Sequence, residues 1–556
     1  MIRLAIVAVC FVALSGAIVG RMVYVNINDR DFLQEQGDLR TIRLERINAH
    51  RGMIRDRLGK PLAISSPVVS LWANPNELLS SSSDLNQLAT MLKVDPEEFA
   101  DRLENSRSRS FVYLRRHMPP PEAEKILSLS LPGLYSEKEY HRFYPAGEVA
   151  AHLVGVTNID DRGQEGVELA FDQWLTGVPG KKKVLKNLYG DIVADIMPVA
   201  DAVPGRDIEL AMDLRLQYLA YRELKAAIQR HEAQSGSIIV LDVASGSVLA
   251  MANQPSYNPN NRQQLDIATV RNRAVTDAFE PGSTLKPFTV AVALESGSHH
   301  PLSRIDTSPG FVRVDDKTIP DPRDMGELNL GDILAHSSQV GISKLALTLD
   351  PFAVRDLLAD VGIGQIPGSG FPGESQGYLP NHRRWTDIER ATLAYGYGVT
   401  TTPLQLANAY LAIARGGVRK QITLLAEEQT STIRVMSEQT ASQLTRMLAK
   451  VVSDGTGGQA HIQGYTVAGK TGTVRKLGES GYEDTRHLAF FAGFAPVQDP
   501  ELVAVVMIND PAGDANGGGS VAAPVFGSVM SGAMRILKVA PDQQVAMSKG
   551  GGDAHG

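Results

Sequence analysis

The sequence predicts a multidomain α/β protein with an N-terminal transmembrane helix, and three observations support this prediction. The chain begins with an apolar segment, its pattern changes near residue 205, and its 556 residues exceed one average domain. We expect an anchor over residues 1–25, a mixed α+β domain over 26–205, a larger domain over 206–540 and a disordered tail over 541–556.

The composition is that of a globular protein and excludes several classes of function. Hydrophobic residues make up 43% and charged residues 21% of the chain, and the formal net charge is -7. No long basic run is present, so nucleic acid is not an expected partner. The one cysteine, Cys10, lies in an apolar segment, and the 12 histidines lack the His-Glu-x-x-His spacing. We therefore expect no disulfide, no cysteine nucleophile and no zinc site.

The first 25 residues read as a membrane anchor. From Leu4 to Val25 the chain is almost wholly apolar, and about 20 such residues cross a bilayer. Arg3 on the leading side favours a cytoplasmic N-terminus and an exported remainder. A cleaved signal peptide is the alternative, but the run is long and no clean Ala-x-Ala site precedes Met22. The retained anchor is the favoured reading.

The polar region that follows alternates between short β and helical signals. Residues 57–60, Arg-Leu-Gly-Lys, predict a turn between two strands. Residues 75–129 predict short amphipathic helices. Pro204 and Gly205 mark a boundary.

The C-terminal region predicts a helix and a set of strands. Asp213 is a plausible N-cap for a helix that ends at His231. Two β-rich runs, 236–242 and 246–251, predict a hairpin. Further strands are expected over three segments, 465–474, 487–494 and 502–508, and helices fill the region between.

One motif suggests a nucleotide-binding enzyme. The run from Gly464 to Thr471 satisfies the phosphate-loop pattern Gly-x-x-x-x-Gly-Lys-Thr. A phosphate loop needs a helix that begins at its Lys-Thr, because the helix amides bind the phosphate. Gly472, Thr473 and Val474 are poor helix starters, and nucleotide is scarce outside the cytoplasm. The phosphate-loop hypothesis is therefore weaker than the alternative that begins at Ser283.

The competing motif begins at Ser283. Glu280-Pro281-Gly282 breaks the chain, and Pro287 is tolerated only near the start of a helix, so a helix begins close to Ser283. Lys286 then lies on the same face, one turn away. A serine hydroxyl is a weak nucleophile that needs a base, and a buried lysine with a lowered pKa can serve.

A lone Ser-x-x-Lys occurs by chance, but here two further motifs follow in order. Ser337-Ser338-Gln339 lies between a loop and a helix, and Lys470-Thr471-Gly472-Thr473 lies on a strand. This order is the signature of penicillin-binding proteins and serine β-lactamases. The chain resembles the class B penicillin-binding proteins of the FtsI type over nearly its whole length, including Arg142-x-Tyr144-Pro145 and Gly166-Val167-Glu168 in the pedestal region.

The resemblance implies a pedestal domain and a transpeptidase domain in which helices flank an antiparallel sheet. It also implies acyl transfer on peptidoglycan stem peptides that end in D-Ala-D-Ala, without a metal or organic cofactor. Ser283 would attack the penultimate carbonyl, Lys286 would take its proton, and Ser337 would relay a proton to the leaving amine. The remaining residues implied at the site are Lys470, Thr471, Gly472 and Thr473 for the substrate carboxylate, with the amides of Ser283 and Thr473 as the oxyanion hole.

Two features depart from the family pattern. Gln339 stands where asparagine is usual, and its extra methylene displaces the amide. Either the loop shifts so that the amide reaches its usual place, or the protein is a specialised paralogue. The expected cytoplasmic tail, residues 1–3, is also short for a septal enzyme.

The resemblance further implies localisation and partners. It places the protein in the cell inner membrane as a single-pass protein with a periplasmic catalytic domain, inhibited by β-lactams. It implies a polytopic glycan polymerase and other division proteins as partners. The alternatives are an elongation-type transpeptidase, a specialised septal paralogue, a β-lactamase or β-lactam sensor, and a non-catalytic division scaffold.

Overall fold

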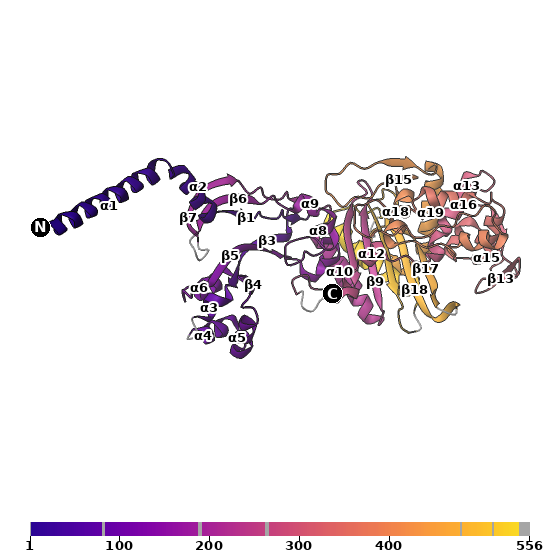
Figure 1. Ribbon diagram of the computed structural model, residues 1–556. Coiled ribbons are helices and arrows are strands. Elements are labelled where there is room, and N and C mark those ends of the chain that lie inside the picture. Colours follow the sequence, from indigo (N-terminus) through magenta and orange to yellow (C-terminus); the bar gives the residue numbers. More distant parts are fainter. Residues whose placement is uncertain are drawn as a thin grey trace, which may run out of the picture. The chain divides into compact units, whose positions relative to one another are not determined.

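A computed structural model describes residues 2–80, 84–186, 192–261, 266–478, 481–513 and 516–543 (Figure 1). The chain forms two compact units, each built from separate stretches of sequence. The first contains Met1–Gly52, Pro67–Tyr140 and Thr176–Arg206, and the second contains Met53–Ser66, His141–Leu175 and Asp207–Gly556. Most of the predicted tail, from residue 544 onward, lies outside the described residues.

The first unit begins with helix α1, Ile2–Ile27, which is long and apolar enough to cross a membrane and has no buried residue. Helix α2, Arg30–Thr41, leads into an antiparallel sheet of β1 (Ile42–Ile47), β6 (Gly180–Lys186) and β7 (Ile192–Ala200).

A second core in this unit joins helices to a pair of strands. The helices are α3 (Pro75–Leu79), α4 (Leu85–Leu92), α5 (Pro96–Glu104) and α6 (Pro120–Leu127), and β5 spans Leu134–Phe143. The wholly helical prediction for residues 75–129 is wrong over β4, Val112–Met118. This strand pairs antiparallel with the second half of β3, Pro61–Ala73, which supplies partners for its backbone groups.

The second unit is organised around a five-stranded antiparallel sheet. Its strand order is β10 (Val248–Gln254), β9 (Ser235–Asp242), β19 (Leu502–Asn509), β18 (Gly481–Ala495) and β17 (Ala468–Gly478). Figure 1 shows β9, β18 and β17 in this sheet. The β9–β10 hairpin confirms the prediction, as do β18 and β19. Strand β17 begins at Ala468, three residues later than expected, because Tyr465 instead forms an isolated bridge with Ile462.

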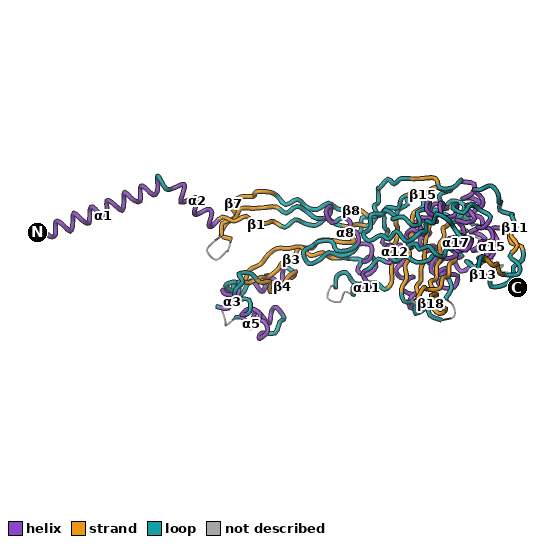
Figure 2. Tube along the Cα trace, turned by 45° about the vertical axis from the view of Figure 1, so that its right-hand side comes forward, coloured by secondary structure: helices purple, strands orange, loops and turns teal. Residues whose placement is uncertain are grey.

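Helices pack on both faces of this sheet. Figure 2 shows the strands of the second unit in orange among purple helices. Ile238 and Val240 of β9 pack with α10 (Leu214–Arg230) and α20 (Gly518–Leu537), and the alternate residues Ile239 and Leu241 pack on the other side with α13 (Lys286–Glu295), α18 (Pro403–Ala414) and α19 (Glu438–Ser453). The predicted N-cap is confirmed, since Asp213 accepts a hydrogen bond of 3.0 Å from the amide of Arg215. Helix α20 is also long and apolar, but 61% of its most apolar stretch is buried in this core.

Smaller elements complete the second unit. They are β2 (Ile54–Arg55), α7 (Ala151–Val154), α8 (Gly166–Ala170), α9 (Asp172–Leu175), β8 (Ile208–Glu209), α11 (Ile267–Val270), α12 (Arg273–Thr276), β11 (Arg304–Asp306), β12 (Phe311–Val314), β13 (Lys317–Pro320), β14 (Glu327–Asn329), α14 (Leu330–Ala335), α15 (Gln339–Leu347), α16 (Ala353–Asp360), α17 (Asp387–Ala394), β15 (Val418–Lys420) and β16 (Thr432–Arg434), with 3-10 turns at Gly147–Val149, Gly282–Leu285 and Gly458–Ala460. The predicted turn at residues 57–60 joins β2 to β3. A fully buried ion pair of 2.6 Å joins Arg142 to Glu168.

Candidate active site

Ser283 lies in the 3-10 turn Gly282–Leu285, directly before α13. The helix start predicted from Pro287 is confirmed, and the refinement is that Lys286, rather than Ser283, is its first residue. The turn is fixed by the Thr284 hydroxyl, which donates to the carbonyl of Pro281 at 2.8 Å, and by the Tyr410 hydroxyl, which donates to the carbonyl of Thr284 at 2.8 Å. The nucleophile candidate is therefore held on a rigid support.

Ser337 links Ser283 to Lys286. The Ser337 hydroxyl donates to Ser283 Oγ at 3.0 Å, and Lys286 Nζ donates to Ser337 Oγ at 3.2 Å and also to the Ser337 carbonyl. Lys286 is fully buried. Lys286 Nζ thus lies one hydroxyl away from the oxygen of Ser283.

The segment that carries Ser337 is held by a residue that sequence reasoning missed. Asp321 accepts hydrogen bonds from the backbone amides of Gln339 and Val340, at 2.6 and 3.2 Å, and from the Ser338 hydroxyl. Ser337 has a left-handed φ of 59°, which is uncommon for a residue with a side chain and needs such support. No local pattern marks Asp321, because its partners lie on a different segment.

Lys470 approaches the same hydroxyl from β17, and its Nζ donates to Ser337 Oγ at 3.1 Å. Next to it, the hydroxyls of Thr471 and Thr456 lie 2.7 Å apart, and Thr473 Oγ1 accepts from the amide of Gly518 at 3.0 Å. Thr456 also lines a cavity of about 330 Å³, and sequence reasoning missed it.

Gly472 allows β17 to lie against the turn that carries Ser283. A Cβ atom at Gly472 would lie 3.0 Å from Thr284 Cγ2 and 3.1 Å from the Pro281 carbonyl oxygen, closer than ordinary contact. Lys470 and Thr471 lie inside strand β17, so no helix begins at them. The phosphate-loop reading therefore fails its structural test.

Burial and like charge set the electrostatics of the two lysines. Burial, followed by the nearby charge of Lys470, holds the pKa of Lys286 well below its ordinary value, while Asp321 acts in the opposite direction. Burial lowers the pKa of Lys470 to about 7. At neutral pH a neutral amine is therefore accessible beside the serine hydroxyls.

Gln339 begins α15, and its backbone amide donates to the Asp321 carboxylate that holds the Ser337 loop. Among the described residues its side-chain amide makes no hydrogen bond, so it is free to meet a ligand. The described part of the chain also holds no group of three or more His, Cys, Asp or Glu side chains suited to a metal ion.

Glu280 is a further residue that sequence reasoning left without a role. Its carboxylate accepts hydrogen bonds from the Gly398 amide at 2.9 Å and from the Tyr482 hydroxyl at 3.0 and 2.9 Å. These contacts tie the residues before Ser283 to the segment around Gly398 and to the start of β18.

Three distant segments thus bring two serine hydroxyls and two buried lysines together, an arrangement suited to acyl transfer through a serine nucleophile. Comparison with known proteins agrees with this class. Residues 236–531 match the penicillin binding protein transpeptidase domain, and residues 46–210 match the penicillin-binding protein dimerisation domain.

Relatives match over nearly the full length. The chain is 41% identical to the probable peptidoglycan D,D-transpeptidase PbpC of Pseudomonas aeruginosa, over 97% of this chain and 96% of that one. It is 40% identical to the peptidoglycan D,D-transpeptidase FtsI of Escherichia coli, over 97% and 92%. A crystal structure of a peptidoglycan synthetase from Bifidobacterium adolescentis matches with a TM-score of 0.73 and 26% identity, over 91% and 98%. The chain belongs to the penicillin-binding proteins of class B, FtsI type.

We expect the substitution Asp321→Asn to slow acylation of the protein by a penicillin roughly ten- to hundredfold, because the loop that carries Ser337 loses its charged acceptor. Loss of this negative charge also lowers the pKa of Lys286 further, so the acid limb of the rate profile should move to lower pH. Stopped-flow acylation across pH measures both effects. Asp324→Asn, on an exposed turn nearby, is the control, and equal rates and profiles for the two variants would contradict the assignment.

The pH dependence of acylation should have two limbs. Below the pKa of Lys286 the amine is protonated and the rate falls; above about pH 7 Lys470 loses its charge and the rate falls again. In Lys470→Arg the alkaline limb should disappear up to about pH 10, because arginine stays charged. An alkaline limb that remains at the same pH in this variant would show that Lys470 does not cause it.

Proposed function

We propose that the protein is a peptidoglycan D,D-transpeptidase that cross-links stem peptides at the division septum through a serine acyl-enzyme. The observation that carries this proposal is the chain of contacts from Ser283 Oγ through Ser337 Oγ to the nitrogens of Lys286 and Lys470. The match to peptidoglycan D,D-transpeptidases over almost the whole chain supports the choice of substrate.

In the first step Ser283 Oγ attacks the carbonyl carbon of the penultimate D-alanine of a stem peptide. The serine proton passes to neutral Lys286, and the Ser337 hydroxyl lies on the shortest hydrogen-bonded path between them. The negative oxygen of the tetrahedral intermediate is bound by the backbone amides of Ser283 and Thr473. When the peptide bond breaks, Ser337 returns a proton to the leaving amine, and D-alanine departs.

The terminal carboxylate of the stem peptide gives the substrate its orientation. Charged Lys470 attracts it, and the hydroxyls of Thr471 and Thr473, beside Gly472, donate to it. The side-chain amide of Gln339, free of partners in the described structure, meets the peptide backbone on the other side.

The second step determines the product. An amine from a neighbouring stem peptide attacks the acyl-enzyme and forms the cross-link, whereas water would give a carboxypeptidase. A β-lactam acylates Ser283 in the first step and leaves no departing group, so the enzyme stays blocked. No metal or organic cofactor takes part in these steps.

The proposal includes a location and partners. Helix α1 anchors the protein in the inner membrane, and the catalytic unit lies in the periplasm, as Arg3 on the leading side favours. A polytopic glycan polymerase and other division proteins are the expected partners. Depletion in the host cell separates the roles: filamentation indicates the septal enzyme, rounding an elongation enzyme, and no change a specialised duplicate.

A labelled penicillin and a stem peptide test the chemistry. We expect the label to attach to Ser283 in the wild type, to be absent in Ser283→Ala and to persist in Ser298→Ala, which alters an exposed serine. Release of D-alanine from an acyl-Lys-D-Ala-D-Ala peptide shows formation of the acyl-enzyme. A cross-linked peptide that forms only when an amine acceptor is present establishes transpeptidation. Absence of label on a correctly folded wild-type protein would contradict the proposed enzyme activity and favour the alternative of a non-catalytic division scaffold.

A further inference from the structure

The second unit contains a cavity of about 860 Å³ whose lining includes none of the residues proposed for catalysis. Apolar side chains form much of its wall, from Val156, Leu169, Val270 and Phe371. The volume lies within the range of roughly 300–1,000 Å³ that is usual for small-molecule sites. Its size and apolar wall suit a ligand with a compact apolar body.

Arg273 contributes a cationic side chain to the lining of this cavity, and one of its guanidinium nitrogens has no hydrogen-bond partner among the described residues. The side chain is only 9% exposed, and its Nη2 donates to the carbonyl of Ala268 at 3.0 Å. Its Nη1 is buried and has no hydrogen-bond partner among the described residues. Burial lowers the pKa of the Arg273 guanidinium, but an arginine stays charged at physiological pH. A buried cationic donor without a partner favours an anionic acceptor.

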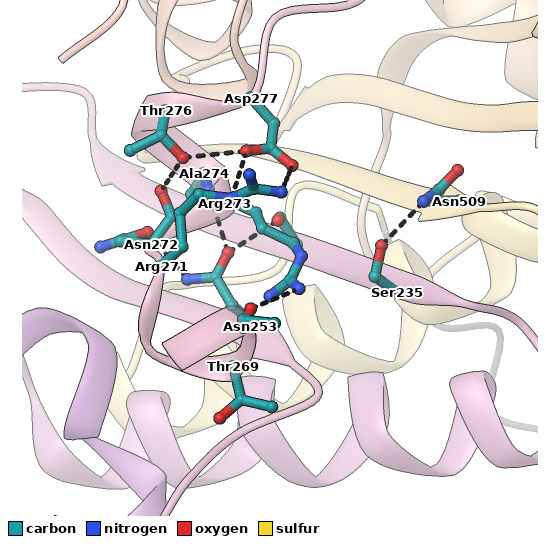
Figure 3. Close-up of polar contacts among 12 residues, drawn as sticks. Ser235, Asn253, Thr269, Arg271, Asn272, Arg273, Ala274, Thr276, Asp277 and Asn509 are labelled. Carbon is teal, nitrogen blue, oxygen red and sulfur yellow. Dashed lines mark hydrogen bonds and ion pairs between the residues drawn. The ribbon is translucent and has the colours of Figure 1, made fainter. Parts of the chain in front are cut away.

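The other charges of the lining narrow the choice of anion. Arg271 is already neutralised by Asp277 in the ion pair drawn in Figure 3. The distance between Arg271 Nε and Asp277 Oδ1 is 3.0 Å. Glu165 adds a carboxylate to the lining. In the described part of the chain, the carboxylates of Asp277 and Asp266 also act on Arg273, which makes no ion pair of its own with them. The described lining therefore has at most one cation left for a ligand, which suits a single carboxylate and disfavours polyanions such as phosphates.

The wall that carries Arg273 is fixed in place. Ala274 N donates to Asn253 Oδ1 at 2.9 Å, and Asn253 Nδ2 donates to Asn272 Oδ1 at 2.8 Å (Figure 3). Asn253 belongs to β10 of the catalytic sheet, and all three residues are buried. The backbone that carries Arg273 is thus held in place, which reduces the cost of ordering this wall on binding.

We propose that this cavity is a second binding site, separate from Ser283, for a small monocarboxylate with an apolar body, such as a peptide fragment with a free C-terminus. The carboxylate pairs with the guanidinium of Arg273, and the apolar body packs on Val156, Leu169 and Phe371. The proposal does not depend on the acyl-transfer function.

Binding of acetyl-leucine and of its neutral isostere acetyl-leucinamide, measured by saturation-transfer NMR and calorimetry on the full chain, tests the proposal. We expect the acid to bind saturably and the amide to bind roughly ten- to hundredfold more weakly, because a charge-assisted hydrogen bond is lost. Arg273→Met should weaken binding of the acid to the level of the amide. Lys470→Met, which removes the charge proposed to attract a carboxylate at the catalytic site, should bind the acid like the wild type, which separates this site from the catalytic one.

A second variant guards against a folding defect in Arg273→Met. Leu169, on the cavity wall, is 41% exposed, so Leu169→Glu should fold normally and repel the carboxylate. Leu58→Glu, at an exposed leucine outside the cavity lining, is the matched control and should bind like the wild type. Thermal melts verify folding of each variant. Equal binding of acid and amide, tighter binding of inorganic phosphate, unchanged affinity in Leu169→Glu, or no binding of the acid to the wild type would overturn the proposal.

Discussion

Two buried lysine side chains donate hydrogen bonds to the same serine hydroxyl, and their closeness sets the protonation state of the site. Lys286 and Lys470 are both fully buried, and their nitrogens lie 3.2 and 3.1 Å from Ser337 Oγ. The nitrogens can therefore lie no more than about 6 Å apart. Two like charges at that distance repel by about 3 kcal/mol at an effective dielectric constant near 20, and burial adds several kcal/mol for each unpaired ion. The double-charged state is therefore disfavoured, and one amine becomes a base.

The two lysines stay close together, despite their repulsion, because each lies on a well-packed element of the second unit. Lys286 begins α13, which is buried along most of its length, and Lys470 pairs with Ala492 in the buried half of β18. Asp321 holds the loop that carries Ser337, and its negative charge raises the pKa of Lys286 against the effect of burial. Packing elsewhere thus offsets the cost of a site whose groups would otherwise separate or take up water.

The sequence predicted the local geometry around Ser283 better than it predicted which distant segments meet there. Pro287 limits where a helix can begin, so the spacing of Ser283 and Lys286 on one turn followed from covalent geometry. Ser337 lies 54 residues from Ser283, and Lys470 lies 133 residues from Ser337, so no periodicity links them. Resemblance to a known family grouped these residues. Asp321 and Thr456 lie outside the three motifs, so only their hydrogen bonds in the folded structure identify them as part of the site. Strand β4 was mistaken for helix because its partner β3 lies far away in sequence.

The protonation state of Lys286 decides whether this lysine can act as the base. In protein labelled with ¹³C at the lysine ε-carbon, and assigned with Lys286→Arg, the Lys286 resonance should titrate well below the ordinary lysine pKa of 10.5. It should move upward when Lys470 is replaced by methionine, because one of the two like charges is removed. A Lys286 resonance that titrates near 10.5 in the wild type would contradict the account.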